Sequence, residues 1–160
     1  MKRFMTLCVA AAGLAAATPA FAQHVAPAGT PFTATGAASL NGAPCTLTLT
    51  ANTNAAGTGG TITGGTNTGA GICPAITVDG GAVYAVTSYN PAGNGSGTAS
   101  LSGLVVRVGG IVACTQVGSL PITITNNATP PGGSTITMSG SVGACTVAAN
   151  LATPTVRAAP

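Results

Sequence analysis

Charged residues are almost absent from this chain. Its 160 residues include four Lys or Arg, one Asp or Glu, one His and no Trp. A single carboxylate cannot form the acidic pair that many hydrolases use, and a zinc site needs several converging His, Cys, Asp or Glu ligands. So few cations make no basic face for nucleic acid. We therefore expect no catalytic residues, no cofactor, no metal site and no nucleic-acid partner.

The first residues resemble an export signal. A short positive start precedes the apolar run Phe4–Ala17, and a small-x-small pattern ends at Ala22, as signal peptidase requires. We predict cleavage between Ala22 and Gln23, which leaves a signal peptide at 1–22 and a single β domain at 23–160. The run is too short for a membrane anchor, since spanning a bilayer takes roughly 20 apolar residues, and no second apolar span follows.

Few polar side chains of the mature chain are candidates for chemistry. The charges that remain after cleavage are Asp79, Arg107 and Arg157, and His24 lies beside the new N-terminus. We expect His24 and Arg157 to be solvated, because chain ends fray. Asp79 precedes Gly80-Gly81, so we expect it in a hairpin turn between strands 76–78 and 83–86. Arg107 interrupts an apolar run, and we expect it on the outer side of an edge strand.

The cysteines predict disulfide bonds. Cleavage removes Cys8 and leaves four widely spaced cysteines, which lack the C-x-x-C pairs of metal sites and, in an exported chain, predict two disulfides. All three connectivities are open. A weak repeat, Gly-Ala-Pro-Cys-Thr-Leu near Cys45 and Gly-Ala-Cys-Thr-Val near Cys145, favours Cys45 with Cys145, and hence Cys73 with Cys114.

Alternating residues predict strands. Cys45–Thr50 alternates Thr with Leu, and 121–125 and 135–139 alternate Ile or Met with Thr or Ser. Period two places Leu47 and Leu49 on one face and hydroxyls on the other, and Gly-rich turns separate the runs. We predict an all-β fold, an antiparallel β-sandwich or open barrel of about eight to eleven short strands.

Two stretches and two tyrosines fit this pattern less well. Residues 52–71 are nearly all Ala, Asn, Thr and Gly, so we expect a long hairpin or excursion with one short strand at 61–63. Residues 89–98 carry the signals of a long loop. Tyr84 and Tyr89 suggest a sugar-stacking platform, but two tyrosines without Trp more often pack in or around a core.

The missing charges also predict how the surface behaves. Strand edges are normally protected by Lys and other charges, and soluble surfaces are normally charge-rich. A secreted chain with Thr-rich strands and no mature Lys is poorly defended against self-association. We therefore expect it to associate with itself, with cell-surface or matrix components, or with a hydrocarbon interface.

The chain resembles the small secreted PraB-type proteins, named as activators of alkane oxidation. The features that carry the resemblance are the signal, Phe32–Gly36 followed by Ala38-Ser39-Leu40, Cys45 before a Thr/Leu strand, the inner Cys73 and Cys114, and the closing Ser139–Cys145. The resemblance implies a secreted, surface-associated or matrix protein linked to growth on hydrocarbons, to adhesion or to biofilm. It implies no catalytic residues. A weaker similarity links the chain to pilin-like and spore-coat-type β domains.

Together these observations predict a non-enzymatic exported protein, secreted or on the cell surface, with the periplasm as an alternative location. It would promote adhesion, biofilm or contact with hydrophobic substrates. The alternatives are a β-sandwich domain that binds a small apolar or glycan ligand, and a pilin- or coat-like structural subunit.

Overall fold

The computed structural model describes residues 24–128 and 132–160, and the predicted signal peptide and its cleavage site at Ala22 and Gln23 lie outside them. Thirteen strands and one 3-10 turn make up the described elements. Eight strands form the main body: β2 (Pro31–Leu40), β3 (Ala43–Thr53), β4 (Gly59–Thr68), β6 (Val83–Asn90), β7 (Ser96–Ser102), β10 (Ser119–Asn126), β11 (Ser134–Val142) and β12 (Cys145–Thr153).

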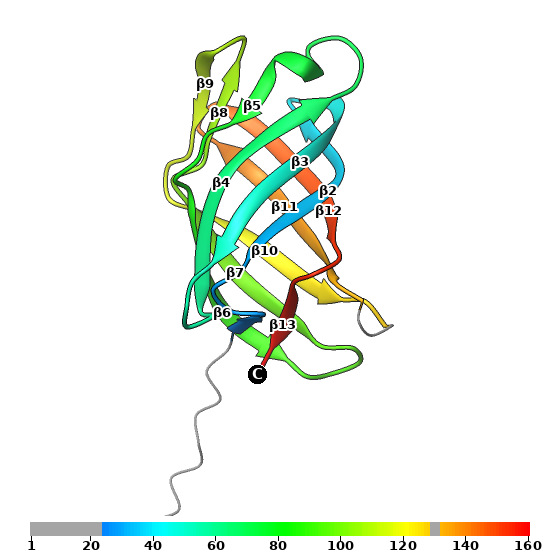
Figure 1. The fold of residues 1–160 in the computed structure, drawn as a ribbon. Coiled ribbons are helices and arrows are strands. Elements are labelled where there is room, and N and C mark those ends of the chain that lie inside the picture. Colours follow the sequence, from blue (N-terminus) through cyan, green and yellow to red (C-terminus); the bar gives the residue numbers. More distant parts are fainter. Residues whose placement is uncertain (1–23, 129–131) are drawn as a thin grey trace, which may run out of the picture.

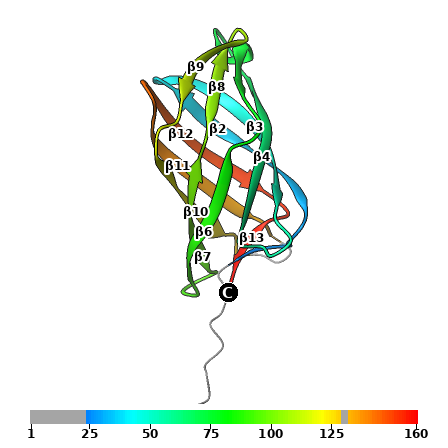
Figure 2. The ribbon, with the colours of Figure 1, turned by 90° about the vertical axis from the view of Figure 1, so that its left-hand side faces the viewer.

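These eight strands close into an antiparallel barrel (Figures 1 and 2). Each strand pairs with the next barrel strand along the chain, and the last, β12, pairs with the first, β2. The all-β, antiparallel, disulfide-bonded prediction is confirmed, and of its two forms the structure is a barrel, which is closed rather than open. Closure leaves the barrel strands without free edges.

Two insertions extend the barrel at one end. The turn η1 (Cys73–Ala75) and β5 (Ile76–Val78) lie between β4 and β6, and the hairpin of β8 (Val105–Val108) and β9 (Ile111–Thr115) lies between β7 and β10. Strand β5 pairs with β4 and β8. Because successive barrel strands alternate in direction, both insertions lie at the same end as the β2–β3 and β11–β12 turns (Figure 1).

The opposite end carries both ends of the described chain. Strand β1 (His24–Ala26) pairs there with β13 (Arg157–Ala159). Val25 of β1 is 1% exposed and Ala158 of β13 is 5% exposed, so this small sheet adds buried apolar side chains at that end of the barrel. Among the residues that the structure describes, no helix is long and apolar enough to cross a membrane.

The predicted alternation places the core inside the barrel. Leu47 and Leu49 are buried, while Thr46 and Thr50 are exposed. Apolar side chains fill the interior from every barrel strand, including Leu101 and Leu151, which are fully buried. The exterior is mostly Thr, Ser, Ala, Asn and Pro.

Of the two forms expected for residues 52–71, the structure has the hairpin and not the excursion, and its second strand is longer than the expected 61–63. Strand β4 spans Gly59–Thr68 and pairs with β3 along its length. Its inward Gly60 leaves room for a neighbour, because a Cβ there would lie 2.6 Å from the Tyr84 hydroxyl. The interior volume is filled from adjacent strands, so β4 needs few apolar residues of its own.

Two smaller expectations are also corrected. The loop expected at 89–98 is shorter, since β6 continues to Asn90 and β7 begins at Ser96. Strand 76–78 does not form a hairpin with 83–86 across Asp79. It pairs with β4 and β8, because Gly80 and Gly81 carry the chain across β4, where Gly81 N–H donates to the Ile62 carbonyl at 2.8 Å.

A candidate interaction surface at the disulfide end of the barrel

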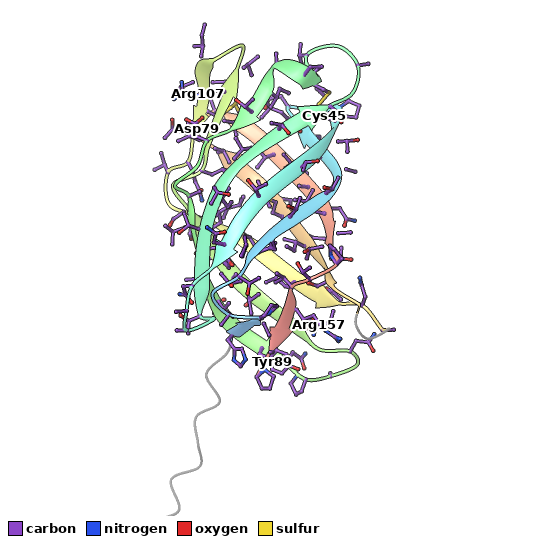
Figure 3. All side chains as sticks on the ribbon, viewed as in Figure 1. Cys45, Asp79, Tyr89, Arg107 and Arg157 are labelled. Carbon is purple, nitrogen blue, oxygen red and sulfur yellow. A yellow bond between two sulfur atoms is a disulfide. The ribbon has the colours of Figure 1, made fainter. Side chains whose placement is uncertain are left out.

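The titratable side chains that the structure describes are spread over both ends of the barrel. Figure 3 places Asp79 and Arg107 at one end of the barrel and Arg157 and Tyr89 at the other. His24 belongs to β1, where it pairs with Ala159 of β13, and Arg157 pairs with Ala26. Within 24–128 and 132–160, no group of three or more His, Cys, Asp or Glu side chains is placed to hold a metal.

Arg107 and Asp79 neutralise each other. Arg107 Nε donates to both carboxylate oxygens of Asp79 at 2.8 Å, and its Nη1 donates to the Gly110 carbonyl at 3.0 Å. The sequence analysis placed Arg107 on an edge strand, and this expectation was wrong. Its strand, β8, lies between β5 and β9. The ion pair ties the residue after β5 to the β8–β9 hairpin.

Both disulfides fasten the inserted segments to the barrel. Cys45 of β3 is bonded to Cys73 of η1, with a Cα–Cα distance of 5.5 Å, and Cys114 of β9 is bonded to Cys145 of β12, at 5.9 Å. The two expected disulfides are therefore present. We call the end that carries them, together with η1 and the β8–β9 turn, the disulfide end.

The expected partners, Cys45 with Cys145 and Cys73 with Cys114, were wrong. Strand β2 lies between β3 and β12 and pairs with both. Two strand spacings amount to about 9–10 Å, whereas a disulfide needs Cα atoms about 4.4–6.8 Å apart. The repeat correctly placed Cys45 and Cys145 at the start of strands at one end, but it could not reveal the strand between them.

Apolar side chains project into solvent at the disulfide end. Ile111 is 75% exposed, Ile72 is 51% exposed and Val112 is 46% exposed. Ile72 precedes η1, and Gly109 N–H of the β8–β9 turn donates to the Ala75 carbonyl of η1 at 2.8 Å. The two segments therefore lie side by side, as Figures 1 and 2 show. We call Ile72, Ile111 and Val112 the apolar tip.

Local backbone geometry holds Ile111 outward. Gly109 and Gly110 have φ values of 60° and 82°, the left-handed pair that a two-residue hairpin turn requires. Ile111 follows immediately and pairs with Val108. The sequence Val-Gly-Gly-Ile-Val carried this turn signal, but a local pattern does not reveal that the turn lies next to η1.

Two cavities inside the barrel are too small for a typical small-molecule ligand. They measure about 50 Å³ and 30 Å³ and are lined almost entirely by apolar side chains. Ligand pockets are usually of the order of 300–1,000 Å³. The interior is thus a packed core.

The tyrosines do not form a sugar-stacking platform. Tyr84 is 7% exposed and packs edge-on against Phe32, with ring centroids 6.5 Å apart. Burial raises the pKa of the Tyr84 hydroxyl to about 12. The Tyr84 side chain therefore belongs to the core. Tyr89, near the end of β6, cannot form a platform with it.

Comparison with known protein families identifies the family of this chain. A family model described as alkane oxidation protein activator PraA/PraB-like matches residues 1–160, the whole chain. No curated protein and no solved structure matches significantly. The match agrees with the resemblance carried by the cysteines and Thr-rich strands, and the chain belongs to the PraA/PraB-like family of alkane oxidation protein activators.

Proposed function

We propose that this protein is exported, has no enzymatic activity, and promotes contact between cells and hydrophobic substrates from the cell surface or extracellular matrix. The observation that carries the proposal is the apolar tip, where Ile72, Ile111 and Val112 are held in solvent at one end of a rigid barrel. The family name refers to alkane oxidation, and alkanes are apolar and poorly soluble. A protein can help cells to contact liquid alkane without catalysing any reaction.

The tip is suited to binding an apolar surface because its exposed apolar side chains are held in fixed positions. Two disulfides, the Asp79–Arg107 ion pair and the Gly109–Ala75 hydrogen bond all lie close to it. Transfer of exposed apolar area from water is worth roughly 25 cal/mol per Å². A rigid tip loses little conformational entropy when it docks, so more of this gain remains as binding free energy.

The charge distribution is compatible with a barrel that contacts an apolar surface through its tip. The ion pair neutralises the charges nearest the tip, while Arg157 lies at the far end with the termini (Figure 3). A barrel standing on its tip would therefore bury no unpaired charge and would present its hydroxyl-rich wall to water. Adhesion and a role in biofilm follow in this proposal from the same attachment.

Self-association through strand edges receives less support. The sequence suggested unprotected edges, but closure through β12 and β2 removes them from the barrel strands. The alternative of a small apolar ligand is also disfavoured, because the interior cavities are only about 50 Å³ and 30 Å³.

Interfacial tension at a hexadecane–water boundary tests the proposal. The exported protein should lower the tension, and Ile72→Lys combined with Ile111→Lys should abolish most of this effect, because each change places a charge in the tip. Thr123→Lys is the matched control, since Thr123 is exposed on β10 away from the tip. Equal tension curves for the tip variant and the native protein, or no effect of the native protein, would refute the proposal.

A further inference from the structure

A second surface of the barrel is rich in threonine. Neighbouring strands β2, β3 and β4 (Figure 1) place outward threonines opposite one another. The register pairs Thr33 with Thr50, and Thr48 with both Thr35 and Thr66. We define the threonine face as Thr33, Thr35, Thr46, Thr48, Thr50, Thr61, Thr63, Thr66 and Thr68.

The hydroxyls of this face are ordered by hydrogen bonds. Thr63 Oγ1 donates to Thr50 Oγ1 at 3.0 Å, and Thr50 Oγ1 donates to the Gly64 carbonyl at 3.1 Å. Thr35 Oγ1 donates to Thr48 Oγ1 at 3.3 Å. A hydroxyl whose proton is committed in this way keeps lone pairs that accept hydrogen bonds. Thr63 and Thr35 thus present acceptors in fixed positions.

The face is also hollowed. A shallow depression of about 650 Å³ lies over it, with Thr33, Thr50, Asn52 and Thr63 among its lining residues. Pro154 and Thr155, from the segment between β12 and β13, also line it. The volume is of the size that ligand sites have, in contrast to the small interior cavities.

The chemistry of the lining selects a ligand. No charged side chain lines the depression, so neither anions nor cations find a counter-charge. Fixed acceptor hydroxyls and an Asn amide match a ligand with many hydroxyl donors, while the Thr methyl groups contact the C–H surface of a sugar ring. The one aromatic residue of the lining, Phe32, is only 9% exposed and so offers little ring surface for stacking. Each sugar would be held weakly, and useful binding therefore requires many sugars on one chain.

We propose that the threonine face binds a neutral polysaccharide. The face is separate from the apolar tip, so this inference stands apart from the proposed attachment to hydrophobic material. If both hold, the barrel links a glycan matrix to an apolar surface.

Retention on an insoluble neutral glucan, with no oil present, tests the inference. The exported protein should bind cellulose, and binding should change little between about 0.1 M and 1 M salt, because the face offers no charge to screen. The double variant Thr50→Val with Thr63→Val removes two ordered hydroxyls and keeps the β-branched shape. We expect roughly tenfold weaker retention, the size that losing one or two neutral hydrogen bonds produces.

A matched control is available on the far side of the barrel. Thr123 and Thr137 also face each other across neighbouring strands, β10 and β11, so Thr123→Val with Thr137→Val removes the same groups elsewhere. This variant should bind like the native protein, and circular dichroism should show the same fold for all three. Equal retention of both double variants, passage of the native protein without binding, or salt-sensitive binding to anionic alginate alone would overturn the inference.

Discussion

The Nε atom of Arg107 lies 2.8 Å from both carboxylate oxygens of Asp79, 28 residues away in the chain. Within residues 24–128 and 132–160 this is the single ion pair between side chains. It joins the segment after β5 to β8, and the Gly110 carbonyl accepts a further bond from Arg107. Asp79 and Arg107 thus hold the inserted hairpin beside the barrel.

Replacing Arg107 with Met should affect this hairpin more than the whole protein. The two side chains are 38% and 31% exposed, so solvent screens the pair and we expect a loss of about 1 kcal/mol or less in the free energy of unfolding. Urea denaturation measures this loss. Hydrogen exchange of the amides at 109–112 should accelerate, because the Gly110 contact is also lost. A loss above roughly 2 kcal/mol would contradict a screened, local role.

The disulfides should contribute far more. The Cys45–Cys73 and Cys114–Cys145 bonds close segments of 28 and 31 residues, for which the chain-entropy model gives about 3–4 kcal/mol each. Cys114→Ala with Cys145→Ala should lower stability by this amount in urea denaturation. Peptide mapping without reductant should recover the same two pairs, and a peptide linking Cys45 to Cys145 would contradict the structure.

The fold class could be predicted from the sequence because period two is a local property. The Thr–Leu alternation around Leu47 and Leu49 correctly assigned the inward face. Strand β4 was predicted only at 61–63 because its inward positions include Gly60 and Gly65, which carry no apolar signal. Their space is filled by Tyr84 and by Leu47 and Leu49 from other strands, and such compensation depends on tertiary packing.

The two candidate surfaces were harder to predict from the sequence than the fold class was. Ile72 and Ile111 are far apart in the chain, and they share one end of the barrel because the turns that carry them, η1 and β8–β9, are joined there by the Gly109–Ala75 hydrogen bond. Outward threonines were expected at 46, 48 and 50, but the rows that they form with Thr33, Thr35 and Thr66 depend on register. Register and barrel closure are long-range properties, which a local pattern does not determine.

Gly36 should be essential for closing the barrel. It lies on β2 opposite Leu151 of β12, and a Cβ at this position would collide with the Asn150 carbonyl. Gly36→Ala should therefore cost about 1–3 kcal/mol, as overpacking usually does. The neighbouring Ala37 is exposed, so Ala37→Ser should stay within about 0.5 kcal/mol of the native protein. Thermal or urea unfolding compares the two, and equal stability would argue against close β2–β12 contact.

Tyr84 should make stability depend on pH in the alkaline range. Burial raises its pKa from 10.0 to about 12 in the folded protein. Below pH 10 the hydroxyl is protonated in both the folded and the unfolded state, so it adds no pH dependence. Between about pH 10 and 12 the unfolded chain releases the proton and the folded protein keeps it, so the free energy of unfolding falls as pH rises.

The fall attributable to Tyr84 should reach roughly 2–3 kcal/mol at the upper end of this window, since one pKa unit corresponds to about 1.4 kcal/mol. Tyr84→Phe removes the titrating group together with its 3.4 Å hydrogen bond to the Asn52 carbonyl. Urea unfolding of both proteins at a series of pH values isolates the effect, because all other groups titrate in both. The native curve should descend toward that of the variant above pH 10, and two parallel curves would show that Tyr84 is not buried as the structure describes.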